Sequence, residues 1–262
     1  MESRNPIFNR SEEFQRGGYA SFSTPSANDL ENMYAAPAAS AVDTGRMTID
    51  DVVVRTGALF AVLLATAAPT YFIWKPSFFV VLAAGLVAMV LAFVTSMGKT
   101  VKVPLMFVYA ALEGVFVGGI SAFYAAAYNG IVPQAVFGTL AAFTAMLVLY
   151  KTGVVRNSPK FTKILMIAGA GYLAFGLINL AIALFTGNSV YSGNPVIAFA
   201  VSAFGVGLAS FFLVLDFDFI EQGVRNGLPE KFAWVAAFGL VTTLVWLYLE
   251  ILRLISILRG GD

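Results

Sequence analysis

The 262-residue chain contains no cysteine and no histidine. The absence of cysteine excludes disulfides, thiolate metal sites and cysteine nucleophiles. The absence of histidine removes the most common metal ligand and the one side chain whose unperturbed charge changes near neutral pH. Any acid–base behaviour near pH 7 must therefore come from carboxylates or lysines in unusual surroundings.

Charge is also scarce. Only 12% of the residues are charged, the net charge is +1, and 59% of the residues are hydrophobic. A soluble domain carries about 25% charged residues. This composition excludes an ordinary soluble enzyme, a disordered protein and a nucleic-acid binder. The sequence has no Gly-rich phosphate loop and no recognisable nucleophile arrangement, so we expect a membrane protein that is not an enzyme and has no cofactor.

The first 46 residues differ from the rest because they are rich in Ser, Asn, Pro and Gly and show no apolar periodicity. They predict a disordered tail, which is either an inert extension or a binding or regulatory segment. The tail lacks the apolar core of a signal peptide. Thr48-Ile49-Asp50-Asp51 resembles a helix capping box, so we place the start of a folded domain, residues 47–262, at this point.

Apolar segments fill the remainder of the chain, and each is near or above the ~18 residues that a membrane-crossing helix needs. Their length and continuity favour helices over barrel strands. The sequence therefore predicts an all-α, polytopic membrane protein with seven transmembrane helices. The seven segments are Gly57–Trp74, Ser77–Met97, Pro104–Ala127, Ile131–Tyr150, Ile164–Phe185, Pro195–Leu215 and Phe232–Leu258.

Lysine and arginine are distributed unevenly between the two sides of these segments. With the N-terminus inside, thirteen fall on the inner side, and only Lys75, Arg253 and Arg259 fall on the outer side. This bias predicts a cytoplasmic N-terminus and an outer C-terminus in a plasma membrane. Small residues also recur at helical spacing, as in Gly114–Gly118 and Gly205–Ala209, and indicate close helix packing.

Acids inside the apolar segments are the candidate functional residues, because a carboxylate deep in a bilayer costs about 2.5–3.5 kcal/mol even on the lenient scale. Glu250 lies near mid-depth in the last segment, with Arg253 three positions on. The two side chains form either a local ion pair or a site at which Glu250 faces a cavity or another helix. Glu113 lies at mid-depth in the third segment and is either protonated or paired with another span.

Asp216 and Asp218 lie at the end of the sixth segment. Asp218 is expected to mark the point where the helix reaches water, whereas Asp216 directly follows the apolar run and is expected to point inward. Residues two apart on a helix face different directions, so both acids cannot line one seam.

The last two segments resemble the closing helices of the Bax inhibitor-1 family, closest to its bacterial branch. The resemblance rests on Leu215-Asp216 with Ile220, on Leu247-Tyr248-Leu249-Glu250-Ile251 and on Leu258-Arg259. It covers roughly residues 48–262 and leaves the tail outside.

This resemblance implies a seven-helix fold with the last helix surrounded by the others, and a pH-sensitive calcium leak across a bacterial inner membrane. It also implies that Asp216 and Glu250 form an acidic pair, although the second position is usually aspartate. In some members a basic residue at the inner end of the second helix holds the pair, and Lys99 and Lys102 lie nearby.

Two carboxyls in contact cannot both ionise cheaply in a low dielectric. At lower pH such a pair shares a proton and bridges two helices. When the proton leaves, two negative charges repel each other and attract a divalent cation, since carboxylate oxygens are calcium ligands. The depth count along each helix places Asp216 near the inner surface and Glu250 near the middle, so helix tilt would have to bring them level.

Two other functions are compatible with the sequence. The protein could restrain another membrane protein such as a protease, with the tail and the Phe-rich lipid-facing surface as its working parts. It could also be a proton-coupled transporter that uses Glu113 with Glu250, although nothing in the sequence indicates a substrate.

Overall fold

A computed structural model describes residues 26–28, 45–98, 100–190 and 194–260. The chain divides into two units, residues 1–40 and 41–262. Of the first unit only residues 26–28 are described, so the predicted disorder of the tail falls almost entirely outside the described residues, as does Lys99. The second unit contains the seven long helices.

Seven helices long and apolar enough to cross a membrane make up the described part of this unit, and it contains no β-strand. This confirms the predicted all-α, polytopic membrane fold. The helices are α2 (Ile49–Pro69), continued by the π-helix η2 (Thr70–Trp74), α3 (Phe78–Ser96), α4 (Val103–Ala127), α5 (Ile131–Lys151), α6 (Pro159–Thr186), α7 (Pro195–Arg225) and α8 (Phe232–Leu258).

Three helix ends lie five or more residues beyond the predicted segments, because α2 begins at Ile49 and not at Gly57, α6 begins at Pro159 and not at Ile164, and α7 ends at Arg225 and not at Leu215. Helix α2 begins at the predicted capping box, where Asp51 N–H donates to Thr48 Oγ1 (3.1 Å) and Thr48 N–H donates to Asp51 Oδ2 (3.0 Å). Helix α7 continues to Arg225, ten residues beyond the expected end at Leu215. Acidic side chains do not interrupt the backbone hydrogen bonds of a helix, so Asp216 lies inside α7 and not at its end.

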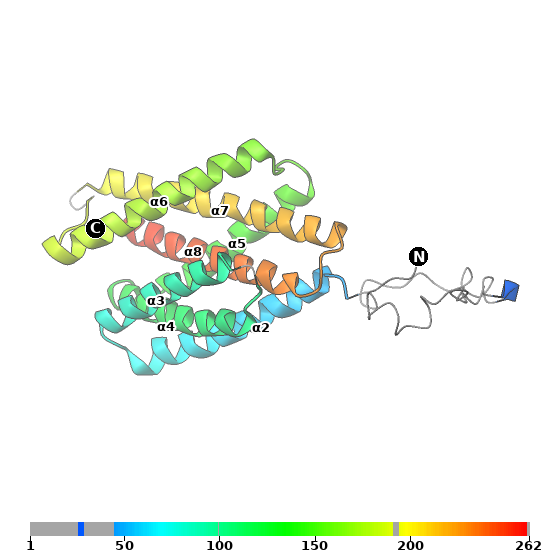
Figure 1. Ribbon diagram of the computed structural model, residues 1–262. Helices are drawn as coiled ribbons and strands as arrows, with labels where there is room; N and C mark the ends of the chain where they lie inside the picture. Colours follow the sequence, from blue (N-terminus) through cyan, green and yellow to red (C-terminus); the bar gives the residue numbers. More distant parts are fainter. Residues whose placement is uncertain (1–25, 29–44, 99, 191–193, 261–262) are drawn as a thin grey trace, which may run out of the picture. The chain divides into compact units, whose positions relative to one another are not determined.

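Helix α8 lies at the centre of the bundle. In Figure 1 it runs between α7 on one side and α2 and α4 on the other, and it packs on α2, α4, α5 and α7. Its apolar window is 61% buried, against 6% for α6, which packs mainly on α7. The implied arrangement, with the last helix surrounded by the others, is confirmed.

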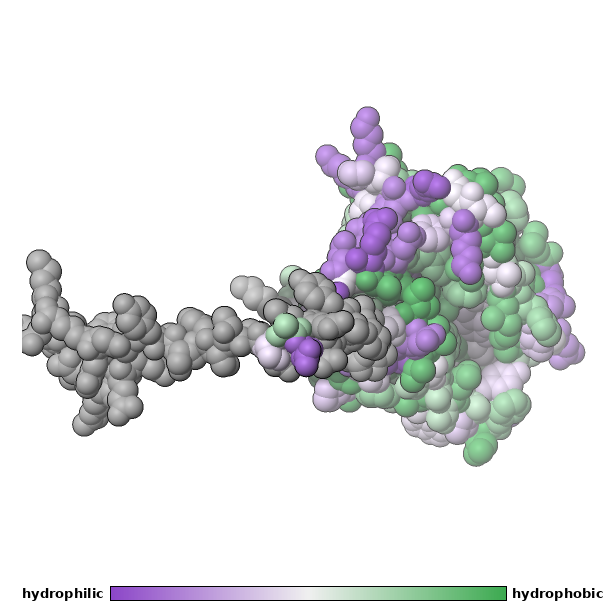
Figure 2. All heavy atoms as spheres, turned by 90° about the vertical axis from the view of Figure 1, so that its right-hand side faces the viewer, coloured by the Kyte–Doolittle hydropathy of each residue, from purple (hydrophilic) through white to green (hydrophobic). Residues whose placement is uncertain are grey.

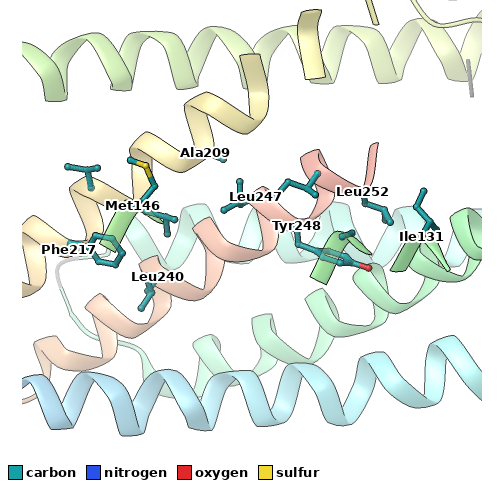
Figure 3. Packing of buried hydrophobic residues seen from close by; sticks show 12 residues of the cluster. Ile131, Met146, Ala209, Phe217, Leu240, Leu247, Tyr248 and Leu252 are labelled. Atoms are coloured by element: carbon teal, nitrogen blue, oxygen red, sulfur yellow. The ribbon is translucent and has the colours of Figure 1, made fainter. Parts of the chain in front are cut away.

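Two apolar clusters pack on opposite sides of α8. One joins α8 to α5 and α7 and includes Met146, Phe217 and Leu247, which Figure 3 shows projecting towards one another. The other joins α8 to α2, α3 and α4 and includes Leu63 and Val241. In a bilayer these clusters hold the helices by close packing, because lipid is as apolar as the core.

The Gly114–Gly118 pair brings α4 against α2. A Cβ on Gly118 would lie 2.4 Å from the carbonyl oxygen of Ala67, and one on Gly114 would lie 2.2 Å from that of Leu63. Backbones approach this closely only where a side chain is missing. The glycines therefore have the packing role that their spacing predicts.

An arginine marks each end of the bundle. At one end, which we call the Arg55 end, the Arg55 guanidinium donates to the carbonyl and the carboxylate of Glu230 in the α7–α8 turn. At the opposite, Arg259 end, Arg259 donates to the carbonyl of Asn129 (2.8 Å) and to Gln134 Oε1 (3.0 Å). Figure 2 looks onto the Arg55 end, where hydrophilic side chains gather over part of the face.

Candidate functional site

Asp216 is partly buried where α7 crosses the first half of α8. Its Oδ1 lies 3.2 Å from the point where a Cβ on Gly239 would stand, so the missing side chain makes room for the carboxyl. The Thr243 hydroxyl, one turn further along α8, is directed at the same carboxyl. The Oδ2 atom is enclosed and has no hydrogen-bond partner among the residues described. The carboxyl therefore points into the protein, as expected.

Glu250 is buried in the other half of the same seam and is 8% exposed. Its Oε1 accepts a hydrogen bond from the indole N–H of Trp246 (3.2 Å), one turn earlier on α8. Its Oε2 lies 2.7 Å from the point where a Cβ on Gly205 would stand, and the Tyr172 hydroxyl lies 2.3 Å from that point. Helices α6, α7 and α8 thus all contribute to the surroundings of this carboxyl.

The structure does not bring the two acids together. Asp216 is level with Gly239, and Glu250 is level with Gly205, so eleven residues separate the two positions along each helix. At 1.5 Å per residue this corresponds to about 16 Å along the seam. The contact pair implied by the resemblance is therefore absent from this structure, and the depth count from the sequence gave the correct order of the two acids.

The register of the two antiparallel helices explains this separation. Asp216 lies nine residues before the end of α7, whereas Glu250 lies eighteen residues after the start of α8. These offsets correspond to about 14 Å and about 27 Å from the connecting turn. With both helices leaving the same turn, the two side chains cannot be level.

Apolar side chains fill the seam between the acids. The rings of Phe212 and Trp246 meet edge to face with centroids 5.4 Å apart. Leu213, Ala209 and Leu247 are fully buried beside them, and Figure 3 shows Ala209 and Leu247 on the facing sides of α7 and α8. These apolar contacts close the seam between the two acids.

A cavity of about 450 Å³ lies at the Arg55 end, between α3, α4, α7 and α8. Gly239 and Thr243 form part of its wall, and these are the residues that face Asp216. Thr95 also lines the cavity, and its hydroxyl oxygen is buried with no hydrogen-bond partner in the described part of the chain. The cavity therefore reaches the wall behind which the Asp216 carboxyl is enclosed.

The accessory candidates lie apart from this cavity. Asp218 accepts hydrogen bonds from Asn157 (2.7 Å) and Gln222 (2.6 Å), so it belongs to the polar surface near the end of α7, as expected. The charge of Arg253 acts on the Glu250 carboxyl. Glu113 is 8% exposed on α4 and forms no ion pair with a described Lys or Arg.

Calcium ligation is limited by this arrangement. Calcium takes six to eight oxygen ligands, often from several carboxylates. Among the described residues, no three acidic side chains form a group that could hold a metal ion. Asp216 and Glu250 would thus each meet a passing calcium ion separately, with hydroxyl, carbonyl or water oxygens as further ligands.

Sequence reasoning missed the residues that surround the acids. The spacing from Gly205 to Ala209 predicts close helix packing at Gly205. It does not predict that Gly205 lies beside Glu250. No sequence pattern predicts the contact of Gly239 with Asp216 or of Tyr172 with Glu250, since both contacts depend on the register between helices.

A model of a protein family described as Bax inhibitor 1 like matches residues 5–260 of the chain. The match begins well before the expected boundary at residue 48, so placing the tail outside the resemblance was wrong. No curated protein matches the chain.

Proposed function

The chain belongs to the Bax inhibitor 1 like family of membrane proteins, and we propose that it is a pH-sensitive leak protein for cations, calcium among them. The proposal assigns it no enzymatic reaction. The observation that supports it most is the Asp216 carboxyl, enclosed behind the Gly239–Thr243 wall of the cavity with one oxygen unpaired. An enclosed acid in a membrane-spanning helix is a functional candidate by default.

In this proposal Asp216 and Glu250 are two separate stations along the α7–α8 seam, not one pair. A cation enters the cavity at the Arg55 end, meets Asp216 when the Gly239 wall moves, and meets Glu250 in the other half. Between them α7 and α8 must part enough to let water replace the Phe212–Trp246 contact. The structure described above corresponds to the closed state.

Protons and cations compete at each station. A charged carboxylate out of water is costly, and either a proton or a bound cation neutralises it. Lowering the pH protonates the Asp216 carboxylate, and the loss of its negative charge removes the attraction for calcium. The flux of cations is therefore expected to rise as pH rises.

The test is calcium flux into liposomes that contain the purified protein and a calcium-sensitive dye, measured over a pH series. Asp216→Asn keeps the shape of the side chain and removes its charge, so the flux and its pH dependence are expected to fall. Asp218→Asn is the matched control, because Asp218 is two residues away and is hydrogen-bonded at the helix end. If Asp216→Asn behaves like wild type, the proposal is wrong.

We place the Arg55 end in the cytosol of a bacterial cell and the Arg259 end outside the plasma membrane. Most described lysines and arginines lie at the Arg55 end, in agreement with the positive-inside rule. Because the chain has no cysteine, a single Lys75→Cys variant provides a label-specific test. A membrane-impermeant maleimide is expected to label it on intact cells, and labelling only after lysis would reverse the orientation.

A membrane regulatory protein is the second candidate, and one observation favours it. The family match includes residues 5–47, so the polar N-terminal segment lies within the matched range. If binding another membrane protein is the function, a pull-down with the full chain captures a partner that a chain lacking residues 1–44 does not. Equal capture by both chains would exclude a role for the segment.

A further inference from the structure

The four residues Gly45–Thr48 dock on the turn that connects α7 to α8. Glu230 N–H donates to the carbonyl of Gly45 (2.9 Å), and Met47 N–H donates to the carbonyl of Leu228 (2.7 Å). Arg46 and Pro229 face each other as an isolated antiparallel bridge. The backbone that leads into α2 is thus paired with the connection between the two helices that carry Asp216 and Glu250.

Met47 fixes this pairing from inside. It is 1% exposed, and its sulfur lies 3.1 Å from the point where a Cβ on Gly223 would stand, so α7 makes room for it. A fully buried apolar side chain stabilises the position that it occupies. The surrounding cluster contains Val52 of α2, Ile220 and Val224 of α7, and Phe232, Ala233 and Ala236 of α8.

Arg55 makes a second connection between α2 and the same turn. Its guanidinium bonds both the carbonyl and the carboxylate of Glu230, lies 3.8 Å from Asp51 and stands 5.4 Å from the centre of the Trp234 ring. The Arg55 side chain is 11% exposed. A guanidinium held by charged, polar and aromatic partners is well fixed in orientation.

We propose that Gly45–Thr48 and Arg55 form a latch that keeps α7 and α8 together at the Arg55 end and thereby limits cation flux. The proposal rests on the proposed leak function. The latch joins the end of α7 to the start of α8. Asp216 lies nine residues before that end of α7, and Gly239 lies seven residues after the start of α8. The two helices must separate there to release Asp216, and the latch opposes this movement.

The packing of Met47 supports this role. Because Met47 touches both α7 and α8, its withdrawal loosens both helices together.

The test uses a disulfide, since the chain has no cysteine of its own. Directly opposed residues of an antiparallel bridge have Cα atoms about 4.5–5.5 Å apart, which is within the range that a disulfide spans. In Arg46→Cys/Pro229→Cys, oxidation is therefore expected to lock the latch. The two single variants are the matched controls, because neither can form this bond within one chain.

Calcium flux into liposomes is compared before oxidation, after oxidation and after reduction. We expect the oxidised double variant to lose flux and to recover it on reduction, while the single variants do not respond. Met47→Ser, which weakens the buried contact, is expected to raise flux above wild type. A disulfide that forms without changing flux, or a pair that does not cross-link in the folded protein, overturns the latch. Absent flux in the wild type instead refutes the leak function.

Discussion

Gly205 is the position at which the surroundings of Glu250 can be tested most sharply. A Cβ there would lie 2.3 Å from the Tyr172 hydroxyl and 2.7 Å from Glu250 Oε2, so Gly205→Ala forces both side chains to retreat by about 1 Å to reach ordinary contact distance. Because the hydrogen bond from Trp246 to Glu250 is already 3.2 Å long, this retreat breaks it.

The magnitude follows from these contacts. Loss of a buried hydrogen bond to a charged group lowers the free energy of unfolding by about 1.5–3 kcal/mol. Replacing glycine by alanine inside a helix raises it by about 1 kcal/mol. Gly205→Ala should therefore lower the free energy of unfolding by roughly 0.5–2 kcal/mol. Gly207→Ala is the matched control. Gly207 lies on the same helix, and a Cβ there would meet no atom within 4 Å.

The assay is equilibrium unfolding of the purified protein in detergent micelles, followed by circular dichroism for wild type and both variants. Gly205→Ala is expected to shift the midpoint to lower denaturant, and Gly207→Ala to leave it unchanged or raise it. If the two variants have the same unfolding midpoint, Gly205 does not accommodate the Glu250 side chain, and the geometry around Glu250 is wrong.

Two further predictions concern packing and titration. Gly118→Ala, which places a Cβ 2.4 Å from the Ala67 carbonyl oxygen, should destabilise the protein by about 1–3 kcal/mol. Gly171→Ala, which meets open space, should not, and equal unfolding midpoints would contradict the α2–α4 contact. Protonation of Glu250 weakens the hydrogen bond from Trp246, so acid should move the tryptophan emission to shorter wavelength. Glu250→Gln should abolish this shift, and an unchanged shift would assign it to another group.

The seven helices were predictable because their apolar runs are long and continuous, and the start of α2 because Thr48 and Asp51 form a local cap. The end of α7 was not, since the acids from Asp216 onward suggest a helix leaving the membrane while its backbone hydrogen bonds continue to Arg225. Local sequence therefore determines these helices better than it determines where they meet water.

The inward direction of the Asp216 and Glu250 carboxyls was also predictable, because both residues follow apolar runs in membrane-spanning helices. Their separation depends on a property of two helices at once, namely the register set by the turn at residues 226–231. No pattern within α7 or α8 encodes that register. For the same reason the neighbours Gly239 and Tyr172 became visible only in three dimensions.

The most direct test of the two-station account is the pH profile of calcium flux for Asp216→Asn, Glu250→Gln and the double variant. Separate stations about 16 Å apart titrate independently. Each single variant should then remove a different part of the pH response, and the double variant should combine the two losses. If either substitution alone abolishes the whole response and the second adds nothing, the carboxyls act as one coupled pair and the account is contradicted.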